Sequence, residues 1–143
     1  VSISYEYDPC DRIKAWEVYR KRTRGTHNKR RYEDLVSMLA GLKGFKGRVH
    51  YRFSEPIRGN FADEKELAHE IDTRIQAGYN LWATNFIAYD VVHHTDLFEQ
   101  SYSQFEKQRF FLRFRRLTDK VKQVLLESYA NPVVNKMLSN RKV

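Results

Sequence analysis

The chain has little cysteine, proline or glycine, and these shortages exclude several classes of protein. Its 143 residues include one cysteine, so an internal disulfide cannot form and a disulfide-stapled secreted scaffold is excluded. Six glycines and three prolines are too few for a collagen-like or low-complexity chain. No apolar run approaches the roughly 18 residues that a membrane-spanning helix needs. We therefore expect a soluble, globular and cytoplasmic chain.

The common catalytic motifs are also missing. The sequence contains no glycine-rich phosphate loop and no nucleophile elbow. His93 and His94 are adjacent, so their side chains diverge on a helix, and no third residue has the spacing of a metal ligand. Cys10 falls in the first turn of a predicted helix without a base nearby in sequence, which favours a structural role. We expect no cofactor and no metal site.

What the chain has in excess is positive charge, and this charge is concentrated. Lysine and arginine number 26 against 18 acidic residues, a net charge of +8. Between residues 12 and 32, nine basic residues stand against Glu17, so this segment alone has a net charge of +8. Such a patch attracts nucleic acid, anionic lipid head groups or phosphorylated substrates, and a solvated surface without a partner is the alternative. The residues that we expect to bind an anionic surface are Arg20, Lys21, Arg22, Arg24, Lys29, Arg30 and Arg31.

Two segments, about 1–7 and 48–53, show the period-two alternation of strands. In the first, Val1, Ile3 and Tyr5 alternate with small or polar residues until Pro9 ends the pattern. Two strands alone do not make a stable sheet, and the two helices expected between them could serve as the crossover that parallel pairing requires. We therefore expect a parallel arrangement at the rim of a sheet, with missing sheet partners upstream of Val1.

Helical periodicity of apolar residues dominates the rest of the chain. We predict helices over residues 11–22, 32–42, 63–77, 82–92, 102–117 and 118–131. Pro132 follows Asn131 and is expected to turn the chain before a short last helix over 133–138. We see no internal repeat and no linker.

The segment 102–117 interleaves aromatic residues with arginines. Phe110, Phe114 and Leu117 recur at helical spacing, and we interpret them first as a packed core stripe. A membrane-surface helix, with arginines at the head groups, is the second interpretation. Stacking of single-stranded nucleic acid on the rings is the third, and it is weak without a sheet that presents them.

The opening residues V-S-I-S-Y-E-Y-D-P-C, at 1–10, resemble the strand that closes the catalytic half of the glycerolphosphate acyltransferase superfamily. The branch that the chain most resembles is bacterial and is similar to the 1-acyl-sn-glycerol-3-phosphate (lysophosphatidate) acyltransferases. Three later stretches fit the same branch: 34–38, 46–50 continuing through 56–57, and 129–132. The resemblance therefore runs along most of the chain.

The resemblance implies a parent enzyme of phospholipid biosynthesis. Such enzymes move a fatty acyl group from acyl-CoA or acyl carrier protein to a lysophospholipid-like acceptor, with a histidine base in an H-x4-D motif and an E-G-T-R phosphate-binding box. Neither motif is present here. The residues five positions after the five histidines are Tyr32, Glu55, Arg74, Phe98 and Glu99, and none is an aspartate. We expect a truncated, non-catalytic C-terminal portion that is inactive alone.

Together these features predict a mostly helical α/β fragment with two sheet-edge strands and five to six helices. Residues 1–60 would belong to the acyltransferase-like domain and residues 61–143 to a helical extension. Val1, Ile3 and Tyr5 would form the strand that backs the acceptor or acyl site.

The partners that we expect follow from the same resemblance and from the charge. They are the missing N-terminal half of the parent, acyl-CoA or acyl carrier protein through that parent, the anionic inner face of the membrane, and a second copy of this chain. A basic helical nucleic-acid-binding module is the alternative function, although it does not explain the opening strand. A helical protein-interaction domain is the third, and it predicts an exposed apolar groove.

Overall fold

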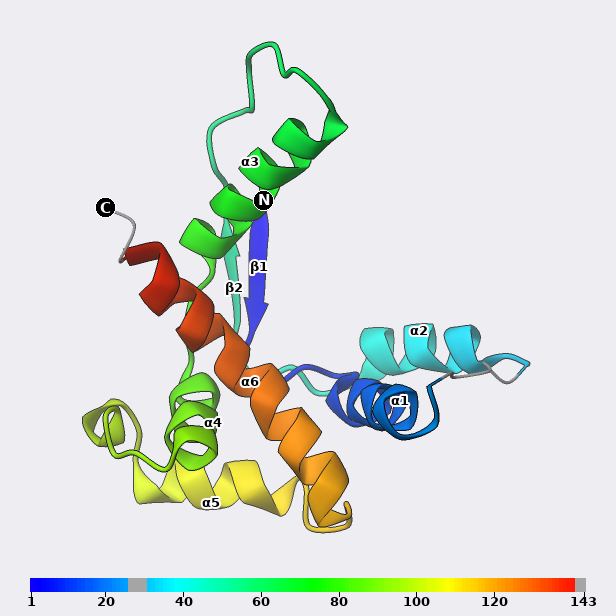
Figure 1. Ribbon diagram of the computed structural model, residues 1–143. Helices are drawn as coiled ribbons and strands as arrows, with labels where there is room; N and C mark the ends of the chain where they lie inside the picture. Colours follow the sequence, from blue (N-terminus) through cyan, green and yellow to red (C-terminus); the bar gives the residue numbers. More distant parts are fainter. Residues whose placement is uncertain (26–30, 141–143) are drawn as a thin grey trace.

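The computed structural model describes residues 1–25 and 31–140, and these fold into a two-stranded sheet and six α-helices (Figure 1). The predicted mostly helical fold with two strands is therefore confirmed. No helix in the described ranges is long and apolar enough to cross a bilayer. In chain order the elements are β1 (Ser2–Tyr5), α1 (Asp11–Arg24), α2 (Glu33–Lys43), β2 (Val49–Arg52), α3 (Glu64–Gly78), α4 (Ala83–His93), the 3-10 helix η1 (Glu99–Ser101), α5 (Gln104–Leu112) and α6 (Asp119–Asn140).

The two strands pair antiparallel, so the expected parallel arrangement is wrong. Ser2 lies opposite Arg52 and Tyr5 opposite Val49. The reason is visible in Figure 1: α1 leads away from the end of β1 and α2 leads back toward the same end of the sheet. A chain that returns to the end it left can only continue antiparallel, whereas a crossover must return to the opposite end.

The hydrophobic core lies around α6, which packs against α4 and α1. Phe110 and Phe114 of the aromatic segment are buried, and their rings meet edge to face with centroids 4.8 Å apart. Phe110 makes a similar contact with Tyr129 of α6 at 5.1 Å. The interpretation of this segment as a core stripe is thus confirmed, although α5 ends at Leu112 and residues 113–117 form turns.

Pro132 does not turn the chain, which corrects the predicted break, because α6 runs through it to Asn140. A proline in a helix leaves the carbonyl four residues earlier without its amide donor. Here the helix is held on both sides of the proline, since Ala130 and Val133 are both buried. In addition, the buried side chain of Asn85 donates a hydrogen bond of 2.9 Å to the carbonyl of Tyr129. Tertiary packing therefore outweighs the local signal.

A buried polar network joins the start of α1 to the middle of α6. The Tyr129 hydroxyl donates to Asp11 Oδ2 at 2.9 Å and accepts from the backbone N–H of Asp8, also at 2.9 Å. Arg113 Nη2 lies 3.3 Å from the same Asp11 oxygen. Burial, together with the Asp11 carboxylate, raises the pKa of the Tyr129 phenol. The network fixes where α1 leaves the sheet, and with it the direction of the α1–α2 hairpin.

We expect Tyr129→Phe to lower the free energy of unfolding by about 1–3 kcal/mol, because the Asp8 N–H and the buried Asp11 carboxylate each lose a partner. Urea denaturation of the variant measures this loss. Tyr51→Phe is the matched control, since the Tyr51 side chain is 57% exposed. Equal stability of both variants and the parent chain would show that the network is not needed.

The same hydroxyl gives the fold an alkaline limit. Above pH about 10 an unfolded tyrosine ionises, whereas Tyr129 in the folded chain keeps its proton. The folded state then binds more protons, so stability is full below that pH and falls as pH rises beyond it. We expect a shallower fall in Tyr129→Phe, measured by urea denaturation between pH 9 and 11. A fall of the same steepness in both proteins would contradict the assignment.

Candidate functional site

The strand residues that were expected to back an acyl site lie on the uncovered face of the sheet. Ile3 lies opposite Tyr51, and Tyr5 opposite Val49, so these side chains share one face. Ile3 is 41% exposed and Val1 is 65% exposed, while Tyr5 is half-buried. The described chain thus leaves an apolar surface on this side, which we call the outer sheet face and define by Val1, Ile3, Tyr5, Val49 and Tyr51.

The opposite face of β1 is buried although it carries serines. Ser2 Oγ donates to the carbonyl of Ile75 at 3.1 Å, and Ser4 Oγ accepts from the Asn80 N–H at 3.2 Å. A Cβ added at Gly78 would lie 2.9 Å from the Ser2 Cβ, so the backbones approach too closely for larger side chains. The end of α3 therefore packs against the small side chains and leaves the large apolar ones outside.

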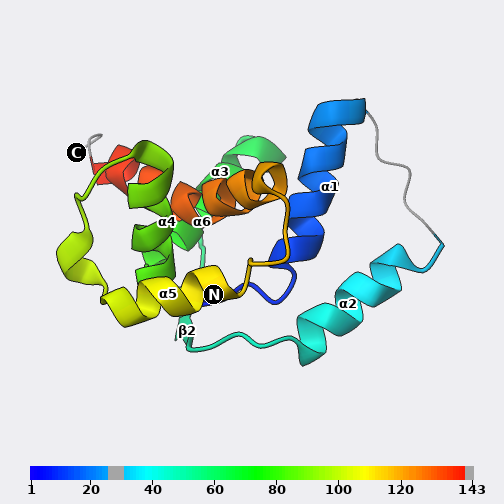
Figure 2. The ribbon, with the colours of Figure 1, turned by 90° about the horizontal axis from the view of Figure 1, so that it is seen from below.

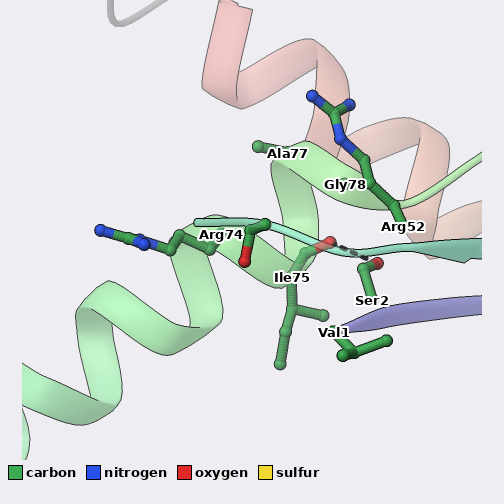
Figure 3. A pocket seen from close by; sticks show the side chains of 8 residues that line it. Val1, Ser2, Arg52, Arg74, Ile75, Ala77 and Gly78 are labelled. Atoms are coloured by element: carbon green, nitrogen blue, oxygen red, sulfur yellow. Dashed lines mark hydrogen bonds between the residues drawn. The ribbon is translucent and has the colours of Figure 1, made fainter. Parts of the chain in front are cut away.

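A hollow of about 240 Å³ opens beside this contact, between the start of β1 and the end of α3 (Figure 3). Arg52 and Arg74 line it, but Figure 3 shows their guanidinium groups pointing in different directions. Arg74 is already engaged, because its guanidinium donates to the Glu55 carbonyl at 2.8 Å. The hollow thus has no converging cations to hold an anion.

A second hollow, of about 480 Å³, lies between the loop before β2 and α5, and Glu6 and Arg48 line one side of it. Arg48 donates to Glu6 Oε2 through its backbone N–H at 2.9 Å and through Nε at 3.2 Å. The hydrogen bond from its side chain to Glu6 raises the pKa of Arg48. The described lining includes Tyr7, Arg109 and the carboxylates of Glu6 and Glu106, but no histidine, cysteine or serine.

The thiol of Cys10 lies between α1 and α2. Its Sγ is 3.4 Å from the carbonyl of Ser37, and a Cβ at Gly41 would lie 3.6 Å from it. The side chain thus packs the α1–α2 contact. Across residues 1–25 and 31–140, no three His, Cys, Asp or Glu side chains lie close enough together to hold a metal ion.

The basic residues that were predicted to bind an anionic surface divide into three groups. Lys29 and Arg30 lie outside the described residues. Lys21 is paired with Glu17 at 3.0 Å, and Arg22 with Glu127 at 2.7 Å. The remaining three have no carboxylate partner in the described part of the chain: Arg20, Arg24 and Arg31.

Two of these unpaired arginines line one hollow. Arg20 lies over the Trp16 ring at 5.9 Å, and Arg31 lies over the Tyr32 ring at 5.2 Å. Both border an open hollow of about 290 Å³ between the end of α1 and the start of α2. Arg20 of α1 and Arg31, which precedes α2, thus line the same hollow at the tip of the α1–α2 hairpin, together with Glu33.

Helix α2 carries an exposed apolar surface that the sequence analysis did not assign to any site. It buries none of its residues, and Figures 1 and 2 show it apart from α4, α5 and α6. Its small residues face the turn before α1, since a Cβ at Gly41 would lie 3.6 Å from Cys10 Sγ. In the sequence, the small residues of this helix cluster on one side, and this pattern could have indicated that the large apolar residues lie on the exposed side. The exposed large apolar residues are Leu35, Val36, Met38, Leu39 and Leu42.

Strand β1 buries its serine face and exposes its apolar face, and this arrangement can be tested directly. We expect Ser4→Val to lower the free energy of unfolding by about 1–3 kcal/mol, because the Ser4 side chain is fully buried and the Asn80 N–H loses its acceptor. Ile3→Thr on the outer sheet face keeps a β-branched residue and should change stability by only about 0.5 kcal/mol. Chemical denaturation of both variants measures the difference. A larger loss for Ile3→Thr than for Ser4→Val would show that the faces are assigned the wrong way round.

No protein-family model, curated protein or solved structure matches this chain. Its function therefore has to be argued from its own residues. The described part of the chain presents surfaces that suit binding: an apolar sheet face, an apolar helix face and a basic hairpin tip.

Proposed function

We propose that this chain is the non-catalytic C-terminal part of a bacterial acyltransferase similar to the glycerolphosphate acyltransferases. The parent enzyme would transfer a fatty acyl group from acyl-CoA or acyl carrier protein to a lysophospholipid-like acceptor. Its base and its phosphate-binding box would lie in the part that precedes this sequence. The role of this chain would be to complete the α/β domain and to hold the enzyme at its membrane.

One observation carries the proposal: each of the three later stretches that resemble the family lies in contact with the first. The stretch 129–132 reaches the first stretch through the Tyr129 hydroxyl, which bonds to the Asp8 N–H. The stretch beginning at residue 46 reaches it through the Arg48 N–H, which donates to Glu6. The stretch 34–38 reaches it through the Ser37 carbonyl and the Cys10 thiol.

Such clustering is what a shared structural motif requires. Residues 1–10 and 129–132 are separated by more than a hundred positions in the sequence, and the fold brings them together. The contacts are also specific, since they are hydrogen bonds that involve the tyrosine, glutamate and cysteine side chains of the matched stretches. The proposal rests on this agreement between sequence resemblance and contact.

The outer sheet face supports the role of completing a larger domain. Ile3 and Tyr51 are exposed side by side, and a two-stranded sheet has free hydrogen-bonding edges that further strands can use. In the parent, preceding strands and helices would cover this face. In the isolated chain, a second copy would be the available partner.

The unpaired cations at the hairpin tip support a peripheral position at the inner face of the membrane. Each basic residue near an anionic bilayer contributes on the order of 1 kcal/mol, so a few suffice for reversible docking. Arg20, Arg24 and Arg31 are free of internal carboxylate partners in the described ranges and can therefore reach head groups.

The enzymatic part of the proposal is tested on the full-length protein that the gene encodes. We expect the full-length protein to transfer an acyl group from acyl-CoA or acyl carrier protein to lysophosphatidate, and this chain alone to show no transfer. Replacing the histidine of the preceding H-x4-D motif by alanine should abolish the activity. A full-length protein with neither motif would contradict the acyltransferase assignment.

Membrane docking is tested by vesicle flotation. We expect Arg24→Glu with Arg31→Glu to weaken binding to phosphatidylglycerol-containing vesicles by about tenfold or more, because two cations become anions. Arg58→Glu with Lys65→Glu makes the same charge change at exposed positions near the far end of the molecule and should bind better than the hairpin variant. Equal weakening by both pairs would show that only net charge matters, and tighter binding to DNA than to vesicles would favour the nucleic-acid function.

A further inference from the structure

We propose that the outward face of α2 inserts into the head-group region of an anionic phospholipid bilayer. This inference rests on the proposed membrane docking and names the element that enters the lipid. The basic hairpin tip would then attract the surface, and the apolar stripe of α2 would hold the protein there.

The first argument is the placement of the apolar residues. Leu35, Met38, Leu39 and Leu42 recur at spacings of three and four, which gathers them into one stripe along the helix. All four are exposed, and Leu42 is 70% exposed. The stripe lies on the side of α2 opposite Ser37 and Gly41, which lie against Cys10 in the turn before α1.

The second argument is the charge that surrounds the stripe. Arg31 and the two acids of the first turn, Glu33 and Asp34, precede it, and Lys43 and Lys46 follow it. Lys46 Nζ donates to the Leu42 carbonyl at 3.1 Å, which keeps this cation at the end of the stripe. Across residues 12–46, eleven basic residues stand against three acidic ones, so the hairpin has a net charge of +8, as large as that of the whole chain.

An anionic bilayer matches this combination better than other occupants do. A nucleic acid would neutralise the cations but would leave the leucines uncovered. A protein surface or a second copy would cover the leucines but would need to desolvate or pair the flanking cations. The interface of an anionic membrane offers an apolar layer beside negative head groups, and amphipathic helices bind there through both contributions.

The attachment of α2 suits such a role. The helix is anchored on one side by Gly41 and Gly44, which pack against Cys10 and Pro9 at the start of α1. The core around α6 does not use the stripe, since none of the residues of α2 is buried. The stripe can therefore enter a bilayer without unfolding the rest of the molecule.

The test uses the whole chain and two vesicle types, phosphatidylcholine alone and phosphatidylcholine with phosphatidylglycerol. We expect Leu39→Asp with Leu42→Asp to lower the partition coefficient onto the anionic vesicles by about tenfold or more. Leu97→Asp with Leu138→Asp is the matched control, because both leucines are exposed and lie outside the hairpin. The control variant should bind clearly better than Leu39→Asp with Leu42→Asp, which we call the stripe pair. Circular dichroism shows whether each variant is folded.

The outcomes separate this inference from the function on which it rests. If the unmodified chain does not prefer anionic vesicles, the proposed docking itself fails. If the chain binds but the stripe pair binds equally well, docking stands and insertion of α2 is overturned. If Leu39→Asp with Leu42→Asp stops the chain from self-associating but leaves its vesicle binding unchanged, a second copy of the chain is the occupant of the stripe. That result would also overturn the inference.

A second measurement keeps the inference testable if the stripe pair does not fold. Leu39→Trp places a fluorophore in the stripe, and Leu97→Trp places one at an exposed position outside the hairpin. We expect bromine-labelled lipids in anionic vesicles to quench the added fluorescence of Leu39→Trp and not that of Leu97→Trp. Equal quenching of the two, or none in Leu39→Trp, would overturn insertion.

Discussion

The hydrogen bonds of one buried hydroxyl determine how this molecule is assembled. Tyr129 lies in the middle of α6, yet its phenol bonds to the backbone of Asp8 and to the carboxylate of Asp11, just after the opening strand. An unpaired carboxylate at this depth would be costly, so the contact holds the start of α1 against the core. The direction of α1 sets the return path of α2, and the return path brings β2 back beside β1.

A common rule explains which surfaces the chain buries and which it leaves open. Elements approach one another through small residues, as Ser2 and Gly78 do between β1 and α3, and as Gly44 and Pro9 do between α2 and α1. The large apolar residues of β1 and α2 are left outside. Exposed apolar surfaces of this extent are typical of binding sites, which is why both proposals concern partners and not chemistry within the described residues.

The sequence predicted local secondary structure well, but it predicted poorly the features that depend on tertiary packing. Apolar periodicity located α1 to α4 within a few residues, because each amphipathic pattern is a local property, whereas it extended α5 too far and divided α6 in two. Strand direction failed because it depends on the path of the intervening hairpin, and the break at Pro132 failed because Asn85 and the core hold α6 together. For the candidate site, the basic tip could be counted from the sequence. The exposure of Ile3 and of the α2 stripe depends on what packs against the opposite face of each element.

In the proposed enzyme, the rest of the protein would cover the outer sheet face. This covering can be measured as the rate at which a thiol reagent labels Ile3→Cys, with Cys10→Ser removing the native thiol. We expect rapid labelling in this chain alone and strong protection in the full-length protein. Equal labelling rates in the two proteins would contradict it, because the face would then be free in both.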